Sequence, residues 1–114
     1  MKLAVYDKAY ALSLEIHRLS LSFPKIEQYE LASQLRRATK SIAMNITEGY
    51  AKRSSQAEFR RFLLIAYGSN QEVKIQLRYS KDLGYITEAE YLYFMEKYEE
   101  VGKMLYSLSS KTAE

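Results

Sequence analysis

An apolar repeat with alternating spacings of three and four residues is the sequence feature that most constrains the fold. The repeat occurs in four separate segments, at residues 5–23, 31–49, 59–77 and 91–108. This spacing places apolar side chains on one face of an α-helix, the face that packs against neighbouring helices. No segment shows the alternation of period two that is typical of a β-strand. The sequence therefore predicts an all-α chain built from four amphipathic helices.

Proline and glycine mark the expected ends of these helices. Pro24 is the only proline, and it should end the first helix because it lacks an amide donor and restricts the residue before it. Gly49 is expected to end the second helix as a left-handed cap, and Gly84 to end the third. The short connection after Gly49 predicts that the third helix returns antiparallel to the second.

Two capping boxes mark the starts of the third and fourth helices. Ser55 and Glu58 have the spacing at which a hydroxyl and a carboxylate satisfy each other's free amides, and so do Thr87 and Glu90. The tail after Ser109 is expected to fray. Together these signals predict an antiparallel up-down-up-down four-helix bundle, with residues 1–114 forming a single domain.

Composition excludes several classes of protein. The chain has no cysteine, which rules out disulfides, thiolate metal sites and a cysteine nucleophile. The start of the chain carries charges within an amphipathic pattern, so it does not resemble a signal peptide, and no apolar run reaches the length of a membrane span. We therefore expect a cytoplasmic protein without a membrane role.

The predicted first helix has two apolar sides. Opposite its main stripe lies a second cluster of residues, which consists of Leu3, Tyr10, Leu14, His17 and Leu21. A helix at the rim of a monomeric bundle needs only one buried stripe, so we interpret the second face as an interface between copies of the chain. The alternative is a core that extends further around the helix.

Four polar residues lie on or beside the core stripes of the second and third helices: Asn45, Glu48, Ser69 and Glu72. We interpret them as structural, because buried polar groups require hydrogen-bond partners. The two helices should place the first pair too far from the second for direct pairing. A paired-carboxylate metal site is the alternative, but the single histidine, His17, lacks the Glu-x-x-His spacing of di-iron bundles. We expect no metal, no cofactor and no catalytic group, and an enzyme using Glu48 or Glu72 is a distant third hypothesis.

The middle of the chain is basic. Residues 29–84 carry ten basic and five acidic side chains, whereas residues 85–114 carry three basic and six acidic ones. The candidate contacts for nucleic acid are Arg36, Arg37, Lys40, Lys52, Arg53, Arg60 and Arg61. Their cations could neutralise phosphates while nearby aromatic rings stack on unpaired bases. The alternative is a solvated face whose cations pair with the acidic fourth helix.

A long set of residues resembles the four-helix-bundle proteins encoded within intervening sequences of bacterial 23S rRNA genes. The first part of the match contains Phe23-Pro24, Glu27, Tyr29, Leu31, Gln34-Leu35-Arg36-Arg37-Ala38, Ser41-Ile42, Asn45-Ile46 and Glu48-Gly49. The second part contains Phe59, Phe62-Leu63, Ala66, Gly68-Ser69, Glu72, Leu77 and Leu83-Gly84-Tyr85-Ile86. Thr47 is a departure, since alanine is commoner there in the family.

The resemblance implies an antiparallel four-helix bundle that assembles as a homopentamer. It also implies similarity to the accessory factor of diversity-generating retroelements, a more basic barrel that binds nucleic acid and its reverse transcriptase. From the residues and the resemblance together, the leading hypothesis is a non-enzymatic homo-oligomer that binds RNA or DNA. The alternative is a scaffold that presents tyrosines to a protein partner and has no role with nucleic acid.

Overall fold

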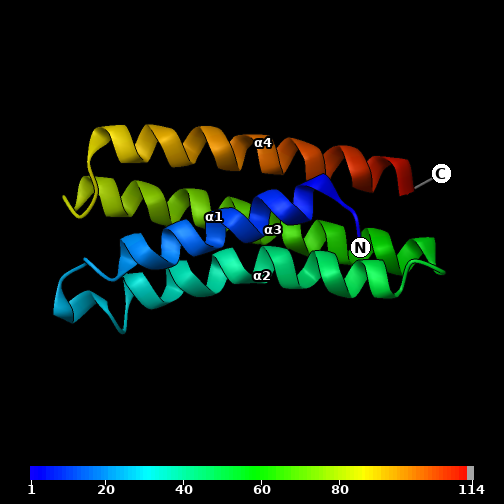
Figure 1. The fold of residues 1–114 in the computed structure, drawn as a ribbon, viewed down its shortest axis with the longest axis horizontal. Coiled ribbons are helices and arrows are strands. Elements are labelled where there is room, and N and C mark those ends of the chain that lie inside the picture. The colour runs from blue at the N-terminus through cyan, green and yellow to red at the C-terminus, as the bar shows by residue number, and fades with distance from the viewer. Residues whose placement is uncertain (113–114) are drawn as a thin grey trace.

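The computed structural model describes residues 1–112 of the chain. Its elements are α1 (Ala4–Ser20), the short 3₁₀ helix η1 (Lys25–Glu27), α2 (Leu31–Ala51), α3 (Gln56–Asp82) and α4 (Glu88–Thr112). Successive α-helices run antiparallel in a bundle 44 Å long (Figure 1). The described part of the chain contains no β-strand. The predicted all-α, up-down-up-down four-helix bundle is therefore confirmed.

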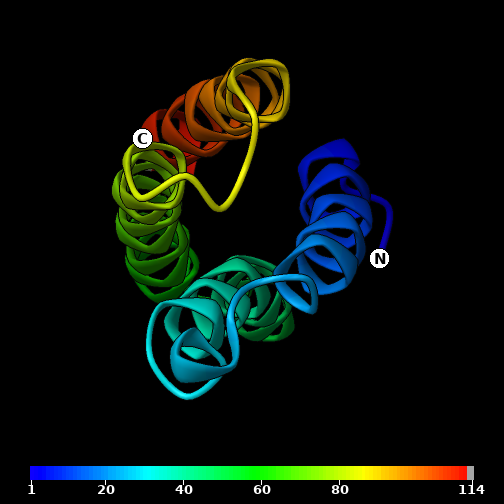
Figure 2. The same ribbon diagram turned by 90° about the vertical axis from the view of Figure 1, so that its left-hand side faces the viewer.

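The helices follow one another in order around the bundle (Figure 2). α1 packs more extensively on α2 than on α4. Polar contacts also join α1 to α4: Lys8 Nζ lies 2.6 Å from Glu100 Oε1, and Tyr93 Oη donates a hydrogen bond of 2.9 Å to Glu15 Oε1. The first helix is thus attached mainly through its neighbour in sequence.

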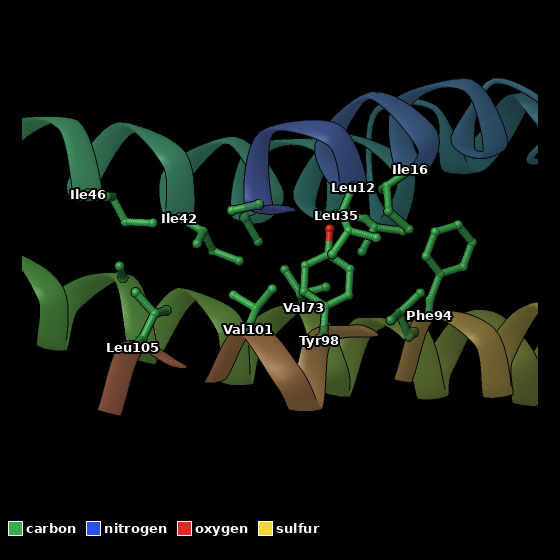
Figure 3. Close-up of a cluster of buried hydrophobic side chains, with 14 of the residues drawn as sticks. Leu12, Ile16, Leu35, Ile42, Ile46, Val73, Phe94, Tyr98, Val101 and Leu105 are labelled. Atoms are coloured by element: carbon green, nitrogen blue, oxygen red, sulfur yellow. The ribbon is translucent and has the colours of Figure 1, made fainter. Parts of the chain in front are cut away.

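The buried apolar side chains form one cluster that draws on all four α-helices. Figure 3 shows Leu12 and Ile16 of α1 pointing towards Tyr98 and Phe94 of α4, with side chains of α2 and α3 between and beside them. Each predicted stripe supplies these buried positions, because residues three and four apart lie on the same helix face. The residues that face the core therefore follow the sequence periodicity closely.

Three buried side-chain oxygens of the described residues have no hydrogen-bond partner: Asn70 Oδ1, Gln76 Oε1 and Tyr98 Oη. Tyr98 is fully buried, and its Oη forms no hydrogen bond to any atom of residues 1–112. Burial raises the pKa of the Tyr98 hydroxyl, and the nearby Glu15 carboxylate raises it further. The hydroxyl therefore stays protonated, and its desolvation opposes folding.

Replacing Tyr98 with phenylalanine is expected to raise the free energy of unfolding by about 1 kcal/mol, because a buried hydroxyl without a partner is removed. Urea unfolding followed by circular dichroism would measure the change. Tyr91→Phe, at a half-buried ring, is the control and should change stability by less than about 0.5 kcal/mol. A loss of stability in Tyr98→Phe would show that the hydroxyl is bonded in solution.

The ends of the helices agree with the predicted signals in two places. Gly84 has φ +81°, and the amide of Tyr85 donates to the Ser80 carbonyl at 2.8 Å, which closes α3 with a Schellman motif. The Thr87–Glu90 capping box forms in both directions, at 2.8 and 3.0 Å. These local signals depend on neighbouring residues in sequence, which explains why they could be predicted.

Two other predicted ends are wrong. α2 runs past Gly49 to Ala51, and Gly49 is not in the left-handed region. A Cβ at Gly49 would lie only 2.9 Å from Phe62 Cβ, so the glycine serves close packing of α2 on α3. α4 also continues three residues beyond Ser109, whose side chain is buried, so fraying does not begin there. The remainder of the predicted frayed tail, residues 113–114, lies outside the described residues.

Candidate nucleic-acid interface

Four of the predicted phosphate contacts gather where α2 passes into α3. Lys52 and Arg53 lie in the turn, and Arg60 and Arg61 lie in the first two turns of α3; all four are exposed. We call these four residues the basic end. Gly49, three residues before Lys52, lies where α2 and α3 approach closely, beside Phe59 and Phe62.

Aromatic rings support three of these cations. The Arg53 guanidinium lies over the Tyr50 ring at 4.0 Å from its centroid, and its Nη1 donates to the Tyr50 carbonyl. Lys52 and Arg61 lie over the Phe62 ring at 4.9 and 4.4 Å. Cation–π contacts of this kind orient a charged side chain while leaving it open to solvent. The cations at the basic end are therefore partly preorganised.

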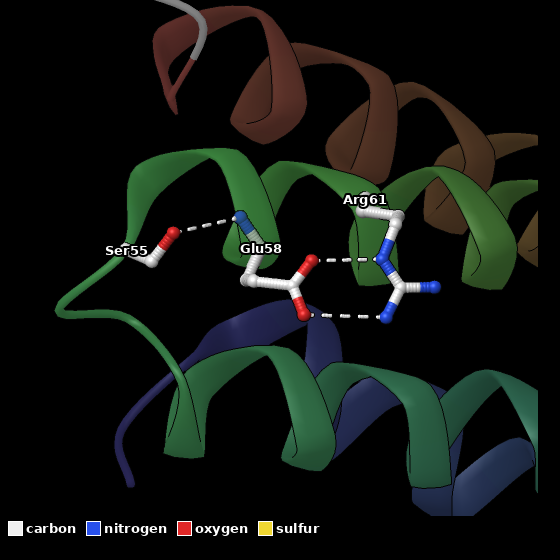
Figure 4. Close-up of polar contacts among 3 residues, drawn as sticks. All are labelled: Ser55, Glu58 and Arg61. Carbon is white, nitrogen blue, oxygen red and sulfur yellow. Dashed lines mark hydrogen bonds and ion pairs between the residues drawn. The ribbon is translucent and has the colours of Figure 1, made fainter.

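Glu58 forms an ion pair with one cation of the basic end, Arg61 (Figure 4). Arg61 Nε donates to Glu58 Oε2 at 2.8 Å, and Arg61 Nη2 donates to Oε1 at 3.3 Å. The hydrogen bond from Arg61 holds the pKa of the Glu58 carboxyl below its ordinary value. Glu58 accordingly does not reach back to Ser55, and only half of the predicted capping box forms, the bond from the Glu58 amide to Ser55 Oγ at 3.2 Å.

Arg36 has a structural place away from the basic end. Its Nη1 donates to Ser20 Oγ at 2.8 Å and to Gln28 Oε1 at 3.2 Å, and its Nη2 donates to the Gln28 carbonyl at 3.0 Å. The half-buried guanidinium thereby ties α2 to the end of α1 and to the connection after η1. These contacts leave it poorly placed to meet a phosphate.

Arg37 and Lys40 are exposed on α2, but they stand apart from the basic end. They precede Lys52 by fifteen and twelve residues, which is roughly 22 and 18 Å along a helix. The seven predicted contacts therefore form three groups: four at the basic end, two along α2 and one in a structural network.

The remaining cations of α3 are largely paired. Lys74 forms an ion pair with Glu99 of α4, and Lys81 Nζ lies 3.8 Å from Oε2 of Glu88, which is also in α4. Arg78 lies 3.8 Å from Asp82. For Lys74 and Lys81, the alternative prediction that cations pair with the acidic fourth helix agrees with the structure, whereas Arg78 pairs within α3.

Ser41 links two of the polar residues that we expected to lie apart. Asn45 Nδ2 donates to Ser41 Oγ at 3.0 Å, and Ser41 Oγ lies 2.8 Å from Ser69 Oγ. The helix pairing places Ser41 opposite Ser69, one turn before Asn45, so α2 and α3 share one hydrogen-bonded network. The structural interpretation is consistent for Asn45 and Ser69, and the two residues are joined only through Ser41, as the expected absence of direct pairing requires.

The structural interpretation is wrong for Glu48 and Glu72, which are both exposed. Glu48 precedes the buried Gly49 and Glu72 precedes the buried Val73, and one residue turns a side chain by about 100° away from the core. Glu72 accepts a hydrogen bond of 3.3 Å from Gln76 within its own helix. Both carboxylates are available to a partner molecule.

The second face of α1 is partly open to solvent. Tyr10, Leu14 and Leu21 are exposed, whereas His17 is half buried and Leu3 packs against the core cluster. A groove of about 570 Å³ runs between this face and α2, and Met44 of α2 lines it together with Tyr10 and Leu14. Its role as an interface stays a prediction.

Residues 1–112 contain no cluster of three or more His, Asp or Glu side chains suited to a metal ion. Among the same residues, no helix is both long enough and apolar enough to cross a bilayer.

Comparison with known proteins identifies the family. The sequence profile described as 23S rRNA-intervening sequence protein matches residues 1–107. The chain belongs to this family. Its structure is also similar to the crystal structure of a protein with unknown function from the S23 ribosomal protein family of Bacteroides thetaiotaomicron, with a TM-score of 0.84 and 26% identity. The similarity covers 93% of this chain and 95% of the other. No curated protein matches the chain.

In this member of the 23S rRNA-intervening sequence family, the cation–π contacts of Lys52, Arg53 and Arg61 were not predicted from the sequence. The signal was present, because Tyr50 precedes Arg53 by three residues and Phe62 directly follows Arg61. Ser41 was also missed, since its role depends on a residue of α3 far along the chain.

Proposed function

We propose that this family member is a non-enzymatic, homo-oligomeric bundle that binds RNA in the cytoplasm through the basic end. The observation that supports the proposal is the group of four exposed cations, Lys52, Arg53, Arg60 and Arg61, which outnumber the two nearby carboxylates, Glu48 and Glu58. Such a group suits the phosphates of a polyanion, and the supporting rings suit unpaired bases. The family takes its name from 23S rRNA, so RNA is the polyanion to test first.

Self-association would multiply this modest charge. One copy offers only a few phosphate contacts, but several copies joined in a ring would present several basic ends to one strand, which raises the effective affinity. The second face of α1 is the proposed contact between copies, and five is the number of copies that the family resemblance implies.

Reversing the charge of Arg53 and Arg60 together is expected to weaken RNA binding by at least about tenfold at low salt. The slope of log affinity against log salt should also become shallower by about one unit for each lost phosphate contact. Fluorescence anisotropy with a labelled single-stranded RNA of mixed sequence, at several salt concentrations, would measure both quantities.

Lys97→Glu with Lys103→Glu is the matched control, because it makes the same change in net charge at exposed positions of α4. This control should bind RNA nearly as well as the wild type does. Equal losses of RNA affinity in the two double variants would mean that binding depends on net charge and not on the basic end. Binding by the wild type that is insensitive to salt would contradict the proposal.

The second candidate is a protein-interaction scaffold, and exposed tyrosines favour it. Tyr29, Tyr79 and Tyr106 are exposed by 89%, 60% and 59% of their surfaces. Rigid aromatic side chains of this kind are enriched where proteins meet. Unchanged behaviour of the Arg53/Arg60 variant, together with no detectable RNA binding by the wild type, would favour the scaffold.

A further inference from the structure

A cup between α3 and α4 is a second concave feature of the surface, and the residues that line it include none of the basic end. Its volume is about 360 Å³, which falls in the range of small-molecule sites. α3 and α4 run antiparallel, so residues 67–74 of α3 lie opposite residues 99–106 of α4. Seven residues of a helix span roughly 10 Å, which sets the length of the cup.

Contacts between the two helices close both ends of the cup. At one end, Lys74 forms an ion pair with Glu99. At the other end, the rings of Tyr67 and Tyr106 meet with their centroids 5.8 Å apart and their planes tilted by 57°. Tyr67 is half buried, whereas 59% of Tyr106 is exposed. Much of the Tyr106 ring is therefore available to a molecule in the cup.

Asn70 and Gly102 form the buried side of the cup, midway between its ends. A Cβ at Gly102 would lie only 2.9 Å from Asn70 Nδ2. The glycine thus lets the Asn70 side chain lie against α4, where its Nδ2 donates a hydrogen bond of 2.9 Å to the Tyr98 carbonyl. This bond fixes a side-chain amide at the centre of the cup.

The fixed amide of Asn70 lacks one partner. Its side chain is fully buried, and its Oδ1 accepts no hydrogen bond from any atom of residues 1–112. A buried acceptor without a donor opposes folding, and an N–H group of a ligand in the cup would supply the missing donor. Gln71 of α3 and Ser107 of α4 are exposed at the rim and add further donors and acceptors.

We infer that the cup binds one nucleobase. A planar base stacks on the Tyr106 ring, and the amides of Asn70 and Gln71 form hydrogen bonds with its edge, which is how proteins hold unpaired bases. An aliphatic ligand would leave the amides unpaired, and inorganic phosphate would make no use of the rings. A free ribonucleotide and an unpaired base of an RNA strand offer the same chemistry. The inference goes beyond the proposed function in the first case and rests on it in the second.

Titration of ¹⁵N-labelled protein with each of the four ribonucleoside 5′-monophosphates tests binding of a free nucleotide. At least one of them is expected to shift the amide NMR signals of Asn70, Gly102 and Tyr106 in a saturable way. Ribose 5-phosphate is the matched control compound, because it has the same sugar and phosphate but no base. It should leave these three signals in place.

Tyr106→Ala removes the stacking ring and is expected to weaken binding of the base at least about tenfold, which is the scale of one base–aromatic stack. Tyr106→Phe keeps the ring and should bind nearly as the wild type does. Tyr79→Ala is the matched control, because Tyr79 is 60% exposed on α3 and lies outside the cup. Circular dichroism should show the same helix content in all three variants, since both tyrosines are exposed.

A short single-stranded RNA and an abasic strand with the same number of phosphates distinguish the two sources of the base. If a strand supplies the base, the wild type binds the RNA more tightly than the abasic strand, and Tyr106→Ala removes most of that difference. Equal binding of the two strands, together with the shifts caused by a monophosphate, identifies a free nucleotide as the ligand. Reversing the charge of Arg53 and Arg60 should weaken both strands alike and leave the monophosphate titration unchanged.

Two results would overturn the inference. In the first, the cup signals do not respond to any monophosphate, and the wild type binds the RNA and the abasic strand equally. In the second, Tyr106→Ala binds the base-bearing ligands as the wild type does. Salt-dependent binding of both strands would still stand as the proposed function in either case. Loss of strand binding with an intact monophosphate titration would instead overturn RNA binding and leave the nucleobase in the cup.

Discussion

Gly49→Val is expected to lower the free energy of unfolding by about 3 kcal/mol, because overpacking at a close helix contact forces the backbones apart. A Cβ at this position would lie 2.9 Å from Phe62 Cβ and 3.3 Å from the Phe59 carbonyl oxygen. Both atoms are fixed to the backbone of α3, so a change of rotamer cannot relieve the contact. Urea unfolding would measure the loss, and thermal unfolding should show a lower midpoint.

Ala11→Val is the matched control for this variant. Ala11 is exposed within α1, so valine there tests the cost of a β-branched residue in a helix without any packing contact. Its effect should stay below about 0.5 kcal/mol. If Gly49→Val were equally mild, α2 and α3 would have to be able to separate at little cost, and the close approach at Gly49 would contribute little to stability.

Arg36→Ala is expected to lower the free energy of unfolding by about 2 kcal/mol, because three hydrogen bonds from a charged donor are lost. The value is lower than the sum of three such bonds because the guanidinium is only half buried. Arg36→Lys should restore little of the loss, since an ammonium cannot reproduce the fork of a guanidinium. Urea unfolding of the two variants would measure both effects.

The neighbouring Arg37 supplies the control, because it is exposed and has the same side chain. Arg37→Ala should change stability by less than about 0.5 kcal/mol. RNA binding should be measured on both variants under conditions in which both are folded. If the Arg36→Ala protein folded with unchanged stability and bound RNA more weakly, Arg36 would be a phosphate contact and not a structural residue.

Arg36 and Arg37 also show why the candidate site could be predicted only in part. The basic stretch is visible in the sequence, and four of its seven members do lie together at the basic end. Adjacent residues of a helix differ by about 100° in direction, so one arginine reaches Ser20 and Gln28 while the next faces solvent. Which of the two arginine side chains contacts a neighbouring helix depends on where α1 lies against α2.

The polar residues of α2 and α3 illustrate the same limit. The stripes of apolar residues predicted the buried faces, yet Glu48 and Glu72, each next to a buried residue, are exposed. The link through Ser41 joins residues twenty-eight positions apart, and it requires the actual pairing of the two helices. The sequence spacing within either helix does not specify that register.

The sequence by itself determined the four helices, their buried faces, the start of α4 at its capping box and the end of α3 at Gly84. These features arise from contacts between residues at most five positions apart, which the local sequence specifies. Only the tertiary structure decided that Gly49 packs instead of capping, that Arg36 is bound within the chain, and that α1 and α2 enclose a groove. Those outcomes depend on how helices are rotated and placed against one another, and that arrangement is set by the packing of the whole core.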